Sequence, residues 1–370
     1  MSDTVYIRPI GFAPGPQSEE GDAVRLAGGL VYASRFAVIL RRDGEVVERW
    51  RGSPESIASV LGQLPDSVAA EAEAQWGNLR MAHPPLELGA RTIRLDQPQV
   101  MGILNVTPDS FSDGGKHVGD PAGTREAIGA MVEAGASIID IGGESTRPGA
   151  EAVWEEEEIR RVVPAVEAAA SMGAAVSIDT RRAGTMEAAL QAGAGIVNDV
   201  SALRYDPRSA ELVATTGCPV VLMHAPGSGN DLHEGGTYES VVFDAFDALR
   251  EWRDAAVAAG IAREKILLDP GLGFGKSLSD NLALINALPL FHALGQPILF
   301  GASRKRMIGA LSKEAAADAR LGGSIALALK AMDAGAQLVR VHDVPETVQA
   351  RDVWRGLRDA ALTDFGDLPG

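Results

Sequence analysis

The chain has 370 residues, of which 46% are hydrophobic and 23% charged, a balance typical of a folded globular protein. Acidic residues outnumber basic ones by 50 to 34, and the formal net charge is −16. This charge argues against a general nucleic-acid-binding protein, because such a protein needs a basic surface to neutralise phosphates. The length allows one large domain and a smaller one, since single cores usually stop growing near ~250–300 residues.

The cysteine content and the distribution of apolar residues indicate the compartment. Cys218 is the only cysteine, which excludes an intramolecular disulfide framework and a cysteine-based zinc site. No apolar stretch is long enough to span a bilayer, and Met1 to Pro14 lacks a basic region followed by an apolar one. We therefore expect a cytoplasmic protein without a membrane partner.

Residues 1–86 are predicted to form a small α/β module of unknown role. The segment Leu30 to Arg41 is rich in β-forming residues, Asp43-Gly44 is a hairpin signal, and Glu45 to Trp50 can return as the partner strand. Ser53 before Pro54 is typical of a helix start. The helical patterns that follow span Pro54 to Leu64 and Ser67 to Leu79. No catalytic constellation is present, so we expect a stability or assembly role, with partner binding or regulation as the alternative.

Residues 87–370 repeat one pattern: an Ala-rich helix, a glycine turn, a short apolar strand and then a polar residue. Examples are EAGASIIDIGG, QAGAGIVNDV and DAGAQLVRVHDV. The predicted strands end near Asn105, Ile141, Asp179, Asn198, His224, Asp269, Gly301 and Val341. Eight strand–helix units predict a (β/α)8 TIM barrel, and continuous apolar strands suit a parallel sheet buried on both faces. A doubly wound open sheet is the alternative, but it would normally carry a phosphate loop after its first strand.

Polar residues at the strand ends should meet, because the active site of such a barrel lies at the carboxyl ends of its strands. Asp179, Asn198 and Asp269 offer hydrogen-bond acceptors and one amide, a set that suits a flat heterocycle with several N–H donors. The cationic donors suit a phosphate-type anion; they are Arg147, Lys305, Arg340 and His342. We interpret Asp140 and Asp199 as turn or helix-cap residues, since a lone Asp after a strand usually has that role.

Two glycine-containing loops need separate interpretation. DPGLGFGKS, Asp269 to Ser277, ends like a P-loop, but Pro270 stands where the first glycine is required, so nucleotide binding is not indicated. LNVTPDSFSDGG, Leu104 to Gly115, carries many side-chain oxygens around Phe111 and ends in two glycines. We expect Asn105 to stay on the rigid strand end and Asp109 to Gly115 to form a mobile lid.

Several ordered blocks resemble the dihydropteroate synthase family. They are MGILNVTPDSFSDGG (101–115), DIGGESTRPGA (140–150), SIDT (177–180), ND (198–199), LMH (222–224), LDPGLGFGK (268–276), GASRKRMIG (301–309) and VRVHDV (339–344). The resemblance covers roughly the last three quarters of the chain. It implies a (β/α)8 barrel that joins (7,8-dihydropterin-6-yl)methyl diphosphate to 4-aminobenzoate in folate biosynthesis, releasing diphosphate and 7,8-dihydropteroate. It also implies a sulfonamide target, Mg²⁺ as cofactor and a homodimer formed through barrel helices.

The resemblance further implies a role for each matching residue. Asp179, Asn198 and Asp269 would hold the pterin, Met223 would pack on it, and Lys305 would reach its carbonyl side. Asn105 would be associated with Mg²⁺, and Arg340 and His342 would bind the diphosphate. The two mobile loops would contribute Phe111 and Asp113 from the first and Thr146 and Arg147 from the second. The aminobenzoate would be bordered by Pro148, Phe274 and Lys305. We expect catalytic contributions from Asp113, Arg147 and Lys305, with fixed carboxylates stabilising a cation-like methylene.

The sequence departs from this family at Arg306, where a small hydroxyl residue is usual after Ser-Arg-Lys. We expect the larger cation to alter aminobenzoate or sulfonamide affinity. The loop after His224 also differs, and His233 within it is expected to be a surface residue. Two alternatives remain: a pterin-dependent methyltransferase barrel, and an inactive pterin-binding scaffold. The intact TPDSFSDGG and ESTRPG blocks argue against the first, and the presence of Asp113, Arg147 and Lys305 argues against the second.

Overall fold

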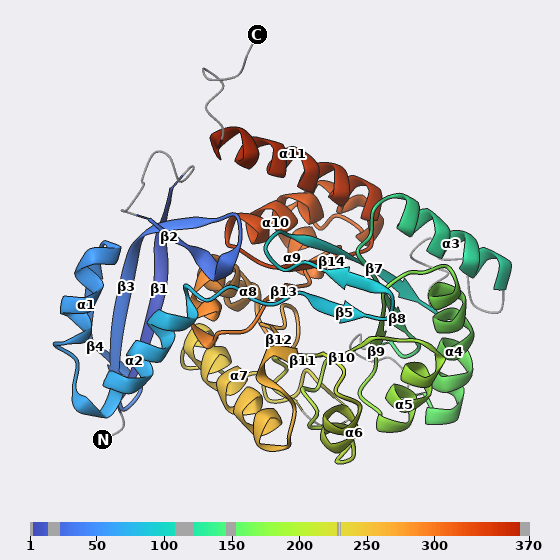
Figure 1. The fold of residues 1–370 in the computed structure, drawn as a ribbon, viewed down its shortest axis with the longest axis horizontal. Coiled ribbons are helices and arrows are strands. Elements are labelled where there is room, and N and C mark those ends of the chain that lie inside the picture. The colour runs from blue at the N-terminus through green and yellow to red at the C-terminus, as the bar shows by residue number, and fades with distance from the viewer. Residues whose placement is uncertain are drawn as a thin grey trace, which may run out of the picture.

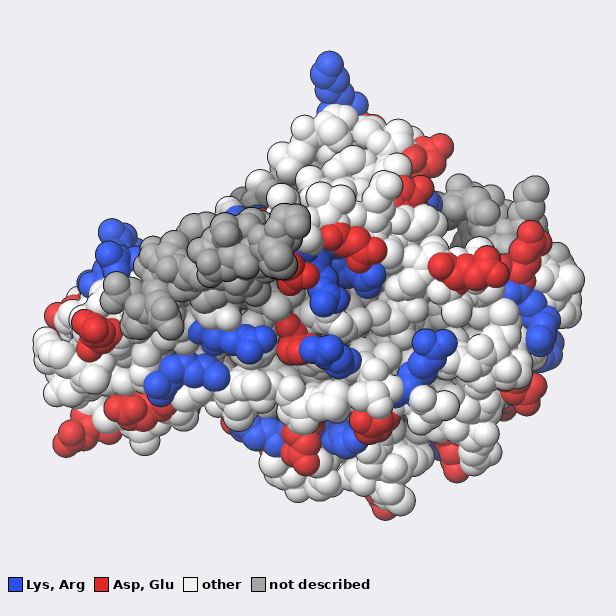
Figure 2. All heavy atoms as spheres, turned by 45° about the horizontal axis from the view of Figure 1, so that its top comes forward, with Lys and Arg blue, Asp and Glu red and all other residues white. Residues whose placement is uncertain are grey.

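The computed structural model describes residues 3–13, 23–107, 121–145, 153–227, 229 and 231–362. Two units are visible in Figure 1: a small sheet with two helices in blue at the left, and a larger barrel surrounded by helices. Figure 2 shows Lys and Arg side chains interspersed with Asp and Glu on the face that it displays. None of the described helices is long and apolar enough to cross a membrane.

Eight parallel strands form the barrel. They are β7 (Gln99–Asn105), β8 (Ile138–Gly142), β9 (Val176–Asp179), β10 (Ile196–Asp199), β11 (Val220–Met223), β12 (Ile266–Asp269), β13 (Leu299–Phe300) and β14 (Leu338–Val341). Their order in the sheet is β12-β11-β10-β9-β8-β7-β14-β13. A parallel bridge between Leu268 and Ile298 joins the two ends of this sheet and closes the barrel.

Helices alternate with these strands around the outside of the barrel (Figure 1). They are α3 (Pro121–Glu133), α4 (Glu155–Ser171), α5 (Ala183–Ala192), α6 (Ser209–Thr216), α7 (Val241–Ala258), α8 (Leu278–Ala287), α9 (Arg306–Leu311), α10 (Leu321–Asp333) and α11 (Val344–Leu362). The predicted (β/α)8 TIM barrel is therefore confirmed. The strands are buried along their whole length, as expected of parallel strands covered by helices.

The amino-terminal module is an antiparallel sheet built around one central strand. Its elements are β1 (Asp3–Ala13), β2 (Val24–Arg25), β3 (Tyr32–Arg42), β4 (Glu45–Gly52), α1 (Pro54–Leu61) and α2 (Asp66–Asn78). The predicted hairpin and both helices are present, and Ser53 occupies the cap position of α1 without a capping hydrogen bond from its side chain. Sequence patterns missed β1, because Pro9 interrupts it where the pairing with β3 shifts register. Proline is tolerated there because β1 is an edge strand.

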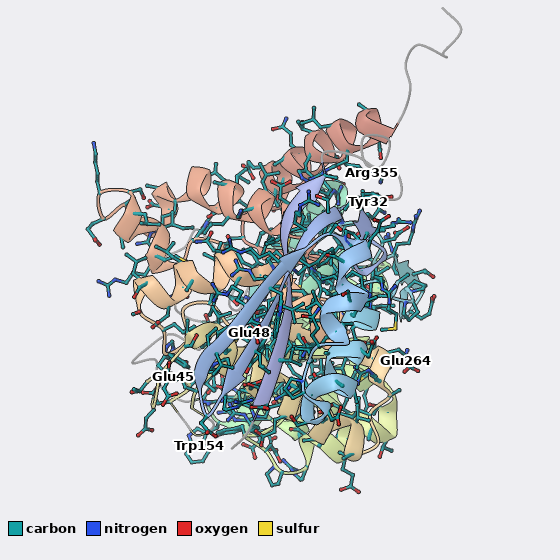
Figure 3. The ribbon with its side chains drawn as sticks, turned by 90° about the vertical axis from the view of Figure 1, so that its left-hand side faces the viewer. Tyr32, Glu45, Glu48, Trp154, Glu264 and Arg355 are labelled. Carbon is teal, nitrogen blue, oxygen red and sulfur yellow. The ribbon has the colours of Figure 1, made fainter. Side chains whose placement is uncertain are left out.

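The module packs directly against the outside of the barrel, beside α7 and the 3-10 helix η5 (Leu288–Leu294). The Tyr6 ring lies 4.4 Å from that of Phe243 and 5.4 Å from that of Phe246, between ring centroids. The Tyr6 hydroxyl donates to Asp247 over 2.6 Å. Figure 3 views the module from its free side, with Glu45 and Glu48 of β4 labelled. Both of these side chains are exposed, and β4 pairs only with β3, so β4 is an edge of the sheet opposite β1.

A short hairpin between the two units closes the amino-terminal end of the barrel. It consists of β5 (Leu86–Leu88) and β6 (Arg91–Ile93), which pair antiparallel. Leu86, Leu88, Ile93 and Leu95 share one buried cluster with the first inward residues of the barrel strands. The barrel is thus sealed by apolar side chains at this end, and polar chemistry is confined to the opposite end.

Candidate active site

The period of two along each strand decides which side chains enter the barrel. The lowest inward layer is apolar and consists of Met101, Ile138, Ala175, Ile196, Val221, Leu267, Leu299 and Leu338. Side chains two or four residues further along point the same way. They are Asn105, Asp140, Asp179, Asn198, Met223, Asp269 and Arg340. The strands therefore place a polar layer directly above an apolar plug.

A cavity of about 1010 Å³ opens above this polar layer at the carboxyl ends of the strands. It is lined by nine of the residues that the sequence singled out: Asn105, Asp179, Asn198, Met223, Asp269, Phe274, Lys305, Arg340 and His342. Six of these residues come from six strands, and the other three come from the loops after β12, β13 and β14. The barrel thus brings them together in one site, as predicted.

Arg340 ties the floor of the cavity together. Its guanidinium donates to Asp140 over 2.5 Å and to Asp179 over 2.6 Å, and the Asn198 amide donates to the same Asp140 oxygen over 3.2 Å. Our interpretation of Asp140 as a turn or cap residue was wrong. Its side chain is fully buried in the floor, because it lies two residues after the inward-facing Ile138. Asp199 does cap its own turn, accepting from the backbone N–H groups of Ser201 and Leu203.

Burial raises the proton affinity of the floor carboxylates. Burial raises the pKa of Asp179 to about 7, with Arg340 opposing the shift and Asp140 adding to it. Burial also raises the pKa of Asp269, where Lys305 and the N–H of Gly271 oppose it. Charged groups held with so little water are expensive in a fold, and such shifts cluster at functional sites. Ligand N–H donors that reach these oxygens would replace the missing hydration.

Lys305 lies between the floor of the cavity and its aromatic wall, which Phe274 and His233 form. Its ammonium donates to the Leu272 carbonyl and lies 5.0 Å from the centre of the Phe274 ring. Burial lowers the pKa of Lys305 to about 8, although Asp269 opposes this shift. The His233 ring stacks on the Phe274 ring, and their centroids are 5.1 Å apart. The expectation that His233 is a surface residue was therefore wrong, since it lines the cavity.

The rim of the cavity carries the anion-binding candidates. Ser303 contacts His342 twice, at 3.2 Å from its backbone nitrogen and 3.0 Å from its ring Nδ1. Asn105 of β7 and Asp179 of β9 lie on either side of Gly142 of β8, and this glycine leaves the space between their side chains open. A Cβ at Gly142 would lie 3.4 Å from the Asn105 amide oxygen and 3.5 Å from the Asp179 Cβ. Phe111, Asp113, Thr146, Arg147 and Pro148 lie outside the described residues.

Sequence reasoning missed two cavity residues that hold loops in place. Glu144 accepts from Arg182 over 2.8 Å and from Arg181 over 3.2 Å. Its pKa is lowered: burial raises it, but the hydrogen bond and charge of Arg182 and the charge of Arg181 outweigh burial. Lys276, set aside as part of a false P-loop, donates to three backbone carbonyls. The signal for Glu144 was present in the sequence, as a charged residue two positions after the end of β8.

Comparison with known proteins identifies the class of this barrel. Residues 101–342 match the family model described as pterin binding enzyme. Dihydropteroate synthase of Escherichia coli (strain K12) is 46% identical over 263 residues, which cover 71% of this chain and 92% of the relative. Dihydropteroate synthase of Bacillus subtilis (strain 168) is 44% identical over 248 residues, which cover 67% of this chain and 84% of the relative.

Solved structures agree with these sequence matches. Xanthomonas albilineans dihydropteroate synthase with 4-aminobenzoic acid has a TM-score of 0.68 and 45% identity. The match covers 78% of this chain and 100% of that structure. Yersinia pestis dihydropteroate synthase in complex with a sulfonamide drug has a TM-score of 0.70 and 45% identity. The match covers 74% of this chain and 99% of that structure. The chain belongs to the pterin binding enzyme family. The function predicted from the sequence, that of a dihydropteroate synthase, a transferase of folate biosynthesis, is confirmed. The methyltransferase and scaffold alternatives gain no support.

Proposed function

We propose that the polar floor of the cavity binds the pterin ring of (7,8-dihydropterin-6-yl)methyl diphosphate, and that 4-aminobenzoate approaches from the Phe274 side. The observation that carries this proposal is the arrangement of Asp179, Asn198 and Asp269 around one cavity with cations on its rim. The carboxylates accept from ring N–H groups, and the Asn198 amide can both accept and donate. Met223 packs against the ring face, and Lys305 donates to the ring carbonyl. Relatives crystallised with 4-aminobenzoate and with 7,8-dihydropteroate support this assignment.

The diphosphate end of the substrate lies toward Arg340, His342 and Asn105. Arg340 remains charged at all relevant pH values, because Asp140 and Asp179 outweigh the effect of burial and raise its pKa. The described residues contain no group of three His, Cys, Asp or Glu side chains that could hold a metal ion by themselves. Asn105 would help to hold Mg²⁺ together with the bound diphosphate, since this ion prefers oxygen ligands and usually takes few of them from the protein. When bound there, Mg²⁺ would neutralise the charge of the leaving diphosphate.

The reaction itself forms one bond and breaks one. The amine nitrogen of 4-aminobenzoate bonds to the methylene carbon, the carbon–oxygen bond to diphosphate breaks, and the amine loses a proton to water. The residues of this chain position both partners and stabilise charge, and no covalent nucleophile is required. Asp113 and Phe111 of the first loop cover the electron-poor methylene, which the Asp113 carboxylate stabilises. Arg147, beside Thr146 on the second loop, stabilises negative charge, and Pro148 borders the aminobenzoate together with Phe274 and Lys305.

Release of diphosphate from the purified chain tests this assignment. Release should require the pterin diphosphate, 4-aminobenzoate and Mg²⁺ together. Asn198→Ala should raise the KM for the pterin substrate and leave that for 4-aminobenzoate nearly unchanged. Diphosphate release without 4-aminobenzoate would argue against a synthase, and an equal change in both KM values would contradict the floor assignment.

The remaining assignments concern organisation and assembly. We assign catalysis to residues 87–370 and a stabilising role to the module of residues 1–86, in a cytoplasmic homodimer. Val353 and Leu357 support association, because they lie one turn apart on α11 and are 62% and 70% exposed. Leu357→Lys should shift the mass in solution from dimer to monomer. An unchanged mass would remove α11 from the proposed interface.

A further inference from the structure

Lys276 is a half-buried lysine on the cavity wall whose ammonium faces carbonyl oxygens. Its Nζ donates to the carbonyls of Gly271 over 2.8 Å, of Phe274 over 3.1 Å and of His224 over 3.1 Å. Three carbonyl acceptors use all three donors of an ammonium. Burial lowers the pKa of Lys276 to about 7, Lys305 adds to this effect, and Asp269 and Asp280 oppose it. The cost of burying this cation is offset by its three carbonyl acceptors, so the ammonium links the segments that carry them.

The bond to the His224 carbonyl fastens the loop after β12 onto the end of β11, and the other two bonds hold the loop in its own conformation. The loop can approach so closely because it contains glycines with positive φ. A Cβ at Gly271 (φ +68°) would lie 1.8 Å from the His224 carbonyl oxygen, and one at Gly275 (φ +57°) would lie 2.3 Å from Pro226. Asn281 supports the same loop from α8, accepting from the Gly273 N–H over 2.6 Å. The loop is therefore held from both sides, by one ammonium and one amide.

The fastened loop carries the two groups that Lys305 contacts. The Leu272 carbonyl accepts from the Lys305 ammonium, and the Phe274 ring lies 5.0 Å from it. Both groups belong to the segment 271–274, whose first and last carbonyls Lys276 holds. Lys305 itself comes from the loop after β13, so no short connection along the chain fixes its position relative to Phe274.

We infer that Lys276 is a positioning residue for the transfer reaction, which sets the relative positions of Phe274 and Lys305 and thereby the aminobenzoate half of the site. This inference rests on the proposed placement of 4-aminobenzoate beside Phe274. Lys276 acts through the loop and contacts no substrate. Loss of its three bonds lets the loop move away from β11, while the pterin floor stays on rigid strand ends.

Steady-state kinetics of Lys276→Met in the full chain, with each substrate varied separately, test this inference. Because a displacement near 1 Å can cost up to about a hundred-fold in rate, we expect roughly a ten-fold rise in the KM for 4-aminobenzoate and a similar fall in kcat. The KM for the pterin diphosphate should change less than about two-fold, since Asp179 and Asn198 keep their hydrogen bonds within the floor. Lys276→Arg keeps charge and donors and should recover most of the loss. Lys313→Met, an exposed lysine outside the cavity, is the matched control.

A double variant separates positioning from general damage. If Lys276 acts through the loop, Lys276→Met combined with Phe274→Ala should raise the aminobenzoate KM no further than Phe274→Ala alone. Equal changes in both KM values, additive effects in the double variant, or no change in Lys276→Met would each overturn the inference. If Lys276→Met does not fold, Lys276→Gln retains two amide donors and the same comparison of KM values applies. Failure of Phe274→Ala to affect the aminobenzoate KM would instead contradict the proposed substrate placement.

Discussion

The module and the barrel use buried polar groups in opposite ways. In the module, Gln75 of α2 is buried and satisfied, donating to the Val5 carbonyl over 2.8 Å and accepting from the Ile7 N–H over 2.9 Å. In the barrel, Asp179, Asp269 and Lys305 are held in a cavity where burial shifts their pKa values against the charged form. The first arrangement stabilises the fold, and the second sacrifices stability to prepare a binding site. Substitutions of these buried polar groups should therefore lower stability in the module and impair function in the barrel.

Asp269→Asn should produce the largest functional effect. The substitution keeps the shape and removes the charge that faces Lys305, so we expect pterin diphosphate binding to weaken by about 3 kcal/mol, roughly a hundred-fold. Stability should stay unchanged or rise, because burial already disfavours the Asp269 carboxylate. Calorimetric titration with the pterin substrate and thermal unfolding give both values. A variant that loses stability and keeps its affinity would remove the contrast between the units.

Gln75→Ala should show the opposite result. It leaves a backbone carbonyl and a backbone N–H of β1 without their partner, which costs about 2 kcal/mol of unfolding free energy. Both KM values and kcat should match those of the unmodified chain below the unfolding temperature, since Gln75 lies far from the cavity residues in the fold. Gln63→Ala, an exposed glutamine on the same module, is the control. A kinetic defect in Gln75→Ala would show that the module influences catalysis directly.

The pH dependence of stability gives a third comparison. The folded-state pKa of Asp179 is raised to about 7 by burial, above its ordinary value of 3.8. Its contribution to stability is therefore fully present below pH ~4 and is lost as pH rises toward 7, where the folded chain must also release the proton. Asp179→Asn should flatten the stability curve between these values. Unfolding by denaturant at several pH values measures this, and an identical slope in the variant would contradict the assignment.

Sequence patterns predicted the barrel well because its strands are short, apolar and buried on both faces. They also predicted the cavity residues at the strand ends, since helix and turn capping alone rarely places polar residues after so many apolar strands, whereas Phe274 was implied only by the resemblance to the dihydropteroate synthase family. Asp140 and Asp199 show where position alone was insufficient. Both follow apolar runs, but Asp140 is two residues after the inward Ile138, whereas Asp199 is three after the inward Ile196 and points away. Counting in twos from the apolar layer would have separated them.

Contacts between distant loops could not be predicted in this way. The bonds of Lys276 depend on how closely the loop after β12 approaches β11, and the stacking of His233 on Phe274 depends on the path of another loop. The strand β1 was missed for a related reason. It is an edge strand whose partner Gln75 lies 70 residues from Val5 along the chain, so local sequence carries little of the information that stabilises it.

Arg306→Ser should have the smallest effect and sharpens the comparison within the barrel itself. Arg304 is held by an ion pair with Asp343 whose Nε–Oδ2 distance is 3.1 Å, whereas Arg306 is exposed on the cavity wall at the start of α9. Exposed charges contribute only about 0.2–1 kcal/mol, so we expect the affinity for 4-aminobenzoate relative to a sulfonamide to change by roughly 1.5- to 5-fold. Stability should rise slightly, because a cation is disfavoured at a helix amino terminus. Inhibition by one sulfonamide at several 4-aminobenzoate concentrations measures the ratio, with Lys313→Ser as the control. An unchanged ratio would show that the departure from the family pattern at Arg306 has no part in substrate selection.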